Sequence, residues 1–111
     1  MMRDTAESAN VVVLCTAPER DVAEKLARLA LDDKVAACVT IIPEVYSYYY
    51  WQGNLEKTPE VQMVFKTNDR NQHALLVLLK QHHPYQIPEL LVLPVAAGDN
   101  EYLLWLNGSL N

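Results

Sequence analysis

The sequence predicts an α+β fold: a ferredoxin-like βαββαβ protomer with an antiparallel sheet and a short C-terminal helix. Apolar runs with strand character occupy residues 10–17, 35–51, 59–67 and 89–95. Helical spacing of apolar residues separates the first run from the second and the third from the fourth. This order is the split βαβ pattern, so we expect the first strand to lie between the third and the fourth.

The first strand and the helix after it are read from "NVVVLCTA" and "TAPERDVAEKLARLALDDK". The first segment is a β-branched run that is short enough for a buried strand. In the second, Thr16 and Glu19 have capping-box spacing, and Pro18 would lie in the first turn. Val22, Leu26 and later apolar residues recur at helical spacing, which predicts a stripe packed on the sheet.

A hairpin is predicted for the middle of the chain. Residues 35–51 have strand character, and Pro43 indicates a break, a bulge or an edge position within them. Gly53, in "QGN", can supply the positive φ of a turn. Residues 59–67 then alternate apolar and polar side chains, as a strand with one buried face does.

The last third of the chain predicts a helix, a strand and a short helix. Asp69 and Gln72 repeat the capping-box spacing at the start of the first of these helices. Pro84 disfavours helical geometry in the residue before it, so this helix should end near residue 81 or 82. The strand "ELLVLPV" follows, and Asp99 is expected to cap the terminal helix.

Length and charge limit the class of protein. The 111 residues suit one domain over residues 9–111, after a flexible N-terminal tail at residues 1–8. A net charge of −5 and a pI near 5.0 argue against a nucleic-acid partner. The N-terminus lacks the apolar stretch of a secretory signal, and no apolar run approaches the roughly 18 residues of a membrane span. A cytoplasmic location and no membrane partner are expected.

The two cysteines are expected to be free thiols. Cys15 falls on the first predicted strand and Cys38 on the second, with the third strand between them. Two strand spacings are roughly 9.6 Å, which is too far for a disulfide. Free thiols suit a reducing compartment.

The adjacent histidines in "QHHPYQIPELL" raise a metal hypothesis. His82 and His83 would end the second helix at the rim of the sheet where Cys15 ends the first strand, and Glu89 opens the strand beside it. A thiol and imidazoles suit copper or zinc, and a thiolate favours Cu(I). The alternative is a plain helix end, because a histidine there is stabilised by the helix dipole. His73, in the first turn of that helix, is expected to be a solvated surface residue.

The second strand run is long for a lone monomer. Residues 35–51 would span roughly 55 Å if fully extended, and strands in small domains are about half as long. Tyr46, Tyr48 and Tyr50 would line one face, and Tyr49 and Trp51 the other. Either the hairpin folds back on its own sheet or another chain covers it, and we expect a homo-oligomer.

No enzyme chemistry is predicted, because the sequence contains no legible pair of nucleophile and base. Carboxylates such as Glu56 and Glu60 are interpreted as solvated surface. An acylphosphatase would need an arginine in a phosphate-cradling loop after the first strand, but Arg20 is expected inside the helix and no glycine shapes that loop.

Five blocks in order resemble the CutA family of divalent-cation tolerance proteins: "ACVTIIP", "SYYYWQG", "EVQMVFKT", "HPYQIPELL" and "YLLWL". The resemblance covers nearly all of residues 11–106, and "VVVLCTAP" with the doubled histidine is most similar to enterobacterial members. It implies a cytoplasmic homotrimer that contributes to heavy-metal tolerance. It also implies one copper ion per subunit, held by Cys15, His82 and His83. The alternative function is a trimeric PII-like sensor or scaffold that binds a small ligand at subunit clefts, with metal binding incidental.

Overall fold

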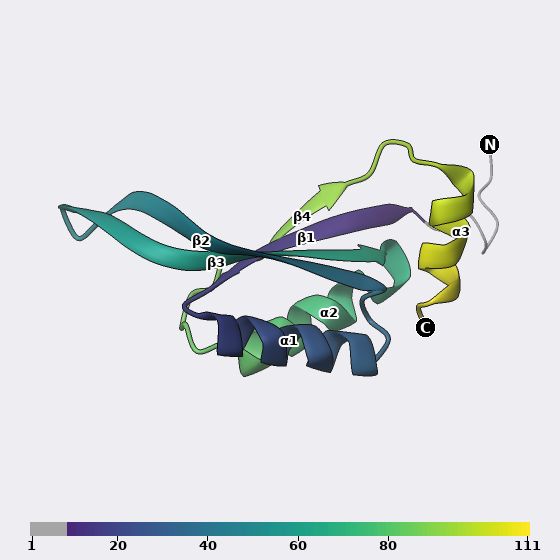
Figure 1. Cartoon of the computed structure of the whole chain (residues 1–111), viewed down its shortest axis with the longest axis horizontal. Helices are drawn as coiled ribbons and strands as arrows, with labels where there is room; N and C mark the ends of the chain where they lie inside the picture. Colours follow the sequence, from purple (N-terminus) through teal and green to yellow (C-terminus); the bar gives the residue numbers. More distant parts are fainter. Residues whose placement is uncertain (1–8) are drawn as a thin grey trace.

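The computed structural model describes residues 9–111, so the tail predicted for residues 1–8 lies outside the described residues. The elements follow in the order β1 (Asn10–Ala17), α1 (Arg20–Asp32), β2 (Cys38–Trp51), β3 (Asn54–Asn68), α2 (Asp69–His82), β4 (Leu91–Pro94) and α3 (Asn100–Gly108). The strands form one antiparallel sheet in the order β2-β3-β1-β4. Helices α1 and α2 cover one face of this sheet, and α3 lies beside the end opposite the hairpin tip (Figure 1). The predicted fold class is confirmed.

Strand β1 is one of the two central strands, and its predicted bounds are confirmed. Along its whole length it pairs with β3, from Asn10 opposite Asn68 to Ala17 opposite Val61. On its other side β4 pairs with it, from Val11 opposite Pro94 to Leu14 opposite Leu91. The β-branched run therefore forms a buried central strand, as its composition predicts.

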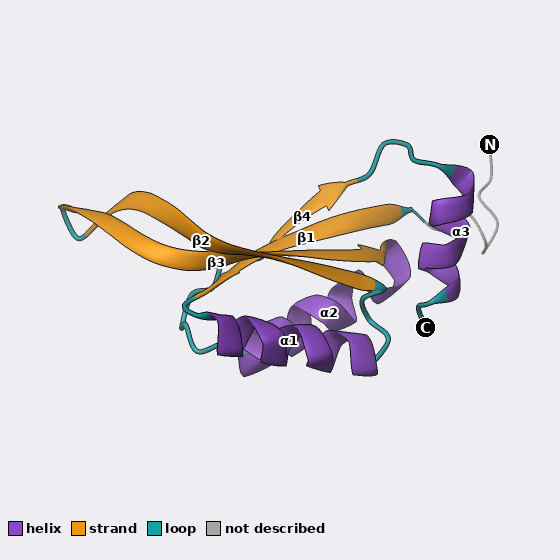
Figure 2. Ribbon diagram, in the orientation of Figure 1, coloured by secondary structure: helices purple, strands orange, loops and turns teal. Residues whose placement is uncertain are grey.

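The β2–β3 hairpin extends well beyond the rest of the sheet (Figure 2). It accounts for the elongated shape of the molecule, 49 × 27 × 22 Å. Its tip is a two-residue loop in which Gln52 and Gly53 have φ of 51° and 82°, the positive values that a type I′ turn needs. The pairing register shifts between Ile42 and Val45, so the irregularity predicted around Pro43 is a bulge in an edge strand.

The strand bounds within the hairpin differ from the prediction. Strand β3 begins at Asn54, not residue 59, because residues 54–58 pair with the outer half of β2. Strand β2 begins at Cys38, and Val35 and Ala36 are instead buried in the connection from α1. The sequence pattern missed the outer part of β3 because both its faces are largely exposed, so hydrophobicity does not alternate there.

The core lies between the sheet and the two helices on its covered face. Helix α1 buries one stripe, comprising Ala23, Leu26, Ala27 and Ala30. Helix α2 contributes Leu75 and Leu79, and the odd-numbered residues of β3, Val61, Met63 and Phe65, face them as the alternation predicts. Burial of these apolar side chains is the main stabilising contribution, at roughly 1.5–3 kcal/mol for each large one.

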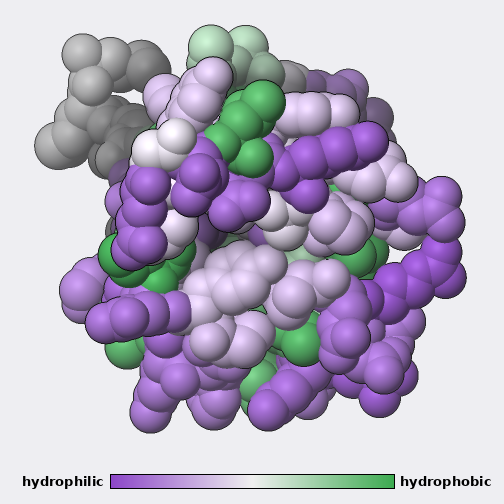
Figure 3. Space-filling view, turned by 90° about the vertical axis from the view of Figure 1, so that its left-hand side faces the viewer, coloured by the Kyte–Doolittle hydropathy of each residue, from purple (hydrophilic) through white to green (hydrophobic). Residues whose placement is uncertain are grey.

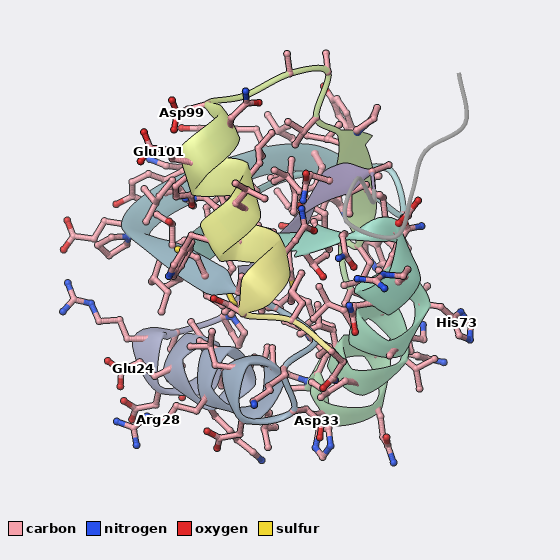
Figure 4. All side chains as sticks on the ribbon, turned by 90° about the vertical axis from the view of Figure 1, so that its right-hand side faces the viewer. Glu24, Arg28, Asp33, His73, Asp99 and Glu101 are labelled. Atoms are coloured by element: carbon pink, nitrogen blue, oxygen red, sulfur yellow. The ribbon has the colours of Figure 1, made fainter. Side chains whose placement is uncertain are left out.

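Two of the predicted helix caps are wrong, and one is confirmed. Thr16 stays in β1, paired with Gln62, so Glu19 occupies the N-cap of α1 without a side-chain hydrogen bond. At α2 the cap is Asn68, one residue before the predicted Asp69. Asp99 does cap α3 and accepts a hydrogen bond from the Tyr102 N–H at 3.0 Å (Figure 4). None of the helices in residues 9–111 combines the length and the apolarity that a membrane crossing needs.

A cluster of asparagines joins α3 to the ends of β1 and β3. The Asn68 side chain accepts from the N–H and the side-chain amide of Asn71, at 3.1 and 2.9 Å, and donates to Asn107 at 2.9 Å. Asn10 donates to the same Asn107 oxygen at 3.1 Å. The Asn71 amide also donates to the Asn111 carbonyl at 2.9 Å. Because these amides satisfy one another, the cluster is stable although Asn68 is fully buried.

Candidate functional site

The structure brings Cys15 and His83 to the same rim of the sheet. Cys15 lies near the end of β1 with none of its surface exposed, and its thiol donates to the Thr16 carbonyl oxygen, with Sγ at 3.6 Å. His83 follows the last residue of α2 and is 8% exposed. Its Nε2 lies 2.7 Å from the same Thr16 oxygen. A carbonyl oxygen can only accept, so Nε2 carries the proton.

The second ring nitrogen of His83 is also in use. The Tyr85 N–H donates to Nδ1 at 3.0 Å, and the two rings lie 4.8 Å apart. With a proton on Nε2 and an acceptor at Nδ1, the imidazole is neutral and held in one orientation. In this arrangement His83 presents no free lone pair to a metal ion.

His82 differs from its neighbour. It ends α2 and its side chain is exposed. Within residues 9–111, no group of three or more histidine, cysteine or acidic side chains is arranged to hold a metal ion. Ligation by Cys15, His82 and His83 therefore stays a prediction: the protomer buries Cys15 and His83 in a closed arrangement, whereas His82 lies exposed beside them in sequence.

Behind the rim lies a polar layer that the sequence did not reveal. The Tyr85 hydroxyl donates to the Glu60 carboxylate at 2.9 Å, and Glu60 is only 8% exposed. The Gln62 amide donates to the Cys15 carbonyl at 3.1 Å and reaches the Glu89 carboxylate at 3.5 Å. The interpretation of Glu60 as solvated surface is therefore wrong. It is covered because the segment after α2 crosses the end of β1, and no local pattern around residue 60 indicates this.

The surroundings of Cys15 keep its thiol protonated. Burial, and then the negative charges of Glu89 and Glu60, raise its pKa from an ordinary 9.0 to about 12. Tyr85 is affected in the same direction: burial, and then its hydrogen bond to Glu60 and the charge of that carboxylate, raise its pKa. At neutral pH Cys15 is therefore a buried thiol, not a reactive thiolate.

The other candidate ligands lie elsewhere. Cys38 is on β2, separated from Cys15 by β3, and both cysteines are free, as predicted. The Lys66 ammonium lies 3.8 Å from the Cys38 sulfur. His73 is exposed on α2 and points away from the body of the molecule, which confirms it as a surface residue (Figure 4).

Comparison with known proteins identifies the family. The family model for the CutA1 divalent ion tolerance protein matches residues 11–109. The divalent-cation tolerance protein CutA of Yersinia pestis (strain Pestoides F) is 59% identical over 100 residues, which cover 90% of this chain and 84% of that protein.

Solved structures agree with this match. The divalent cation tolerance protein from Thermus thermophilus has a TM-score of 0.89 at 37% identity, covering 92% of this chain and 99% of that one. CutA1 from Oryza sativa has a TM-score of 0.93 at 33% identity, covering 96% and 98%. The residues matched by the family model include helices α1, α2 and α3, the sheet apart from Asn10, and the rim with Cys15 and His83. The chain belongs to the CutA family of divalent-cation tolerance proteins, which are not enzymes.

Proposed function

We propose that this protein binds copper, and other divalent metals, and so contributes to heavy-metal tolerance as a cytoplasmic homotrimer. Each subunit would be one ferredoxin-like domain over residues 9–111 and would bind one copper ion through Cys15, His82 and His83. The observation that carries the proposal is the shared rim: His83 is hydrogen-bonded to the carbonyl of Thr16, the residue next to Cys15. Membership of a divalent-cation tolerance family supports it.

The donor chemistry of these residues fits copper, although their present arrangement is closed. A thiolate with imidazoles is a soft ligand set, which suits Cu(I). Cys15 would bind as the thiolate despite its raised pKa, because a metal ion stabilises a coordinating thiolate. His83 would first have to release either the Thr16 carbonyl or the Tyr85 N–H. Metal capture on this proposal therefore includes a local opening of the rim.

The surface of the long hairpin supports an oligomer. Tyr46, Tyr48 and Tyr50 are 59%, 63% and 75% exposed, and Trp51 is 54% exposed. The free edge of β4 adds Leu91 at 54% exposed. Apolar surface of this extent beside open strand edges is normally covered by another chain. The number of subunits, three, rests on the family resemblance.

A cytoplasmic location is compatible with the state of the cysteines. Both Cys15 and Cys38 are free thiols, and they lie on strands separated by β3. This separation alone prevents a disulfide between them, so the free thiols are compatible with a reducing compartment but do not require one. This argument is about redox conditions and is independent of the metal proposal.

The test is an anaerobic Cu(I) titration followed by mass measurement of the intact oligomer. We expect one copper per subunit and three subunits per particle for the natural chain. A Cys15→Ala, His82→Ala, His83→Ala variant should lose the copper. The matched control is Cys38→Ala with His73→Ala, which removes a cysteine and a histidine outside the proposed set and should bind as before. Equal copper affinity in the triple variant would refute the ligand assignment.

A further inference from the structure

At the base of the β2–β3 hairpin, a thiol and an amine lie side by side. Cys38, the first residue of β2, is directly opposite Lys66 of β3 in the strand pairing, so the two side chains stand on the same face of the sheet. The Lys66 nitrogen lies 3.8 Å from the Cys38 sulfur. Both side chains are half-buried. Two groups that can react with one another are therefore held within reach.

This pair is separate from the proposed copper ligands. Met63 and Phe65 of β3 face the core under α1 and α2, so Lys66 and the cysteine opposite it stand on the other face of the sheet. Cys15 belongs to that core. The sheet itself therefore lies between the two thiols.

The pair is also separate from the aromatic surface that supports an oligomer. Figure 3 looks onto the hairpin tip, where side chains of intermediate hydropathy gather among strongly hydrophilic ones. Cys38 is at the other end of β2, and the strand from Cys38 to Trp51 is roughly 40 Å long. Covering the outer hairpin by another chain would leave the base of the hairpin a distinct place.

Helix α3 also contributes to the surroundings of the amine. The Lys66 nitrogen lies 5.9 Å from the centre of the Tyr102 ring, within the range of a cation–π contact. The otherwise flexible lysine stem is thus placed between a ring on α3 and a sulfur on β2. Cys15 has no exposed surface, so of the two thiols Cys38 is the one more accessible to a small oxidant.

We propose that Cys38 and Lys66 form a reversible covalent bridge when the protein meets hydrogen peroxide. In the first step the Cys38 sulfur attacks a peroxide oxygen. The S–O bond forms, the O–O bond breaks, and the hydroxide leaves with the thiol proton as water, which gives a sulfenic acid. In the second step the Lys66 amine, having released its ammonium proton to solvent, attacks this sulfur. The N–S bond forms, the S–O bond breaks, and the hydroxyl leaves with an amine proton as water, which gives a sulfenamide.

The bridge would act as a reversible record of peroxide exposure. It holds Cys38 at the oxidation level of the sulfenic acid, and so protects it from irreversible conversion to higher acids. A small thiol restores both side chains: it attacks the bridged sulfur and releases the amine, and a second thiol reduces the resulting mixed disulfide. Bridging also removes the positive charge of Lys66 beside Tyr102. None of these steps depends on metal binding.

The experiment treats the full-length, chelator-treated protein with hydrogen peroxide at about pH 8.5, where more of a lysine's amine is neutral than at pH 7. We expect the mass of the denatured chain to fall by about 2 Da, the loss of two hydrogens, and to recover with dithiothreitol. Fragment spectra of the natural chain should locate the bridge between Cys38 and Lys66. A disulfide with Cys15 would give the same mass loss, so the measurement is repeated in Cys15→Ala, which should still form the bridge.

Two lysine variants complete the test. Lys66→Arg keeps a cation beside the thiol but removes the nucleophilic amine, so it should lose the bridged species and accumulate sulfinic acid, heavier by about 32 Da. The matched control is Lys57→Arg, on the same strand but opposite Tyr48, which should form the bridge as the natural chain does.

Three results would overturn the proposal. The first is an equal mass loss with and without Lys66→Arg in the Cys15→Ala background. The second is sulfinic acid at Cys38 of the natural chain with no bridged species. The third is a Cys38 thiol that the peroxide treatment leaves intact. The Cys15→Ala, His82→Ala, His83→Ala variant should still form the bridge, which separates failure of this pair from failure of the copper site.

Discussion

Replacing Tyr85 by phenylalanine tests the polar layer behind the rim. The change removes one hydroxyl that donates to the Glu60 carboxylate at 2.9 Å. Glu60 is 8% exposed, so little water can replace the lost donor. A hydrogen bond to a charged group contributes about 1.5–3 kcal/mol, and we expect Tyr85→Phe to lower the free energy of unfolding by about 2 kcal/mol.

Tyr49→Phe is the matched control for this substitution. It also removes one hydroxyl, but that hydroxyl shares a hydrogen bond with Thr58 at an exposed position, 2.9 Å away. Water can take its place, so the expected loss is about 0.5 kcal/mol. Guanidinium unfolding at one fixed protomer concentration measures both, since oligomerisation makes stability concentration-dependent. Equal losses for the two variants would show that Glu60 does not depend on Tyr85.

Three further predictions concern stability and use the same unfolding measurement. Asn68→Ala should cost about 3 kcal/mol, because it removes the α2 cap and the bond to Asn107, whereas Asn68→Ser keeps a capping oxygen and should cost about half as much. Burial raises the pKa of Cys15 from 9.0 to about 12, so the unfolded chain releases the thiol proton at a lower pH than the folded chain does. The free energy of unfolding should therefore be unaffected below pH 9 and should fall as the pH rises toward 12. This fall should be smaller in Cys15→Ala, which has no thiol to titrate. Gly53→Ala should lower the free energy of unfolding by about 1 kcal/mol, because a φ of 82° is unfavourable for alanine. No steric contribution is expected, since a Cβ at this position meets no atom within 4 Å. A loss well above about 1 kcal/mol would indicate a contact across the hairpin tip.

Most of the fold could be predicted from the sequence, because its signals are local. Strand β1 is a β-branched run with its predicted bounds, and α2 ends just before the residue that precedes Pro84, as the proline requires. The prediction that Thr16 caps α1 was wrong because pairing with a distant strand, β3, competes with the local capping pattern. Thr16 satisfies its backbone in the β1–β3 ladder, and a capping-box spacing cannot reveal that competition.

The candidate site was less predictable, because it depends on contacts between distant segments. The topology correctly placed Cys15 and His83 at one rim, since that follows from strand and helix order. The hydrogen bonds that occupy both nitrogens of His83 come from Thr16 and Tyr85 backbone groups, which no side-chain pattern encodes. The burial of Glu60 likewise requires a segment some 25 residues later in the chain to cross over it.

The pairing of β1 has a consequence for how the chain folds as it is synthesised. The first strand to leave the ribosome is central, yet both its partners are made later: Asn10 pairs with Asn68 at the end of β3, and Val11 with Pro94 at the end of β4. The β2–β3 hairpin, whose strands are joined by a two-residue turn, can close much earlier because its loop is short. A nascent chain therefore carries an unpaired β-branched strand until the preformed hairpin docks beside it. The charged residues of α1, which follows directly in the sequence, would help to keep such a nascent chain soluble.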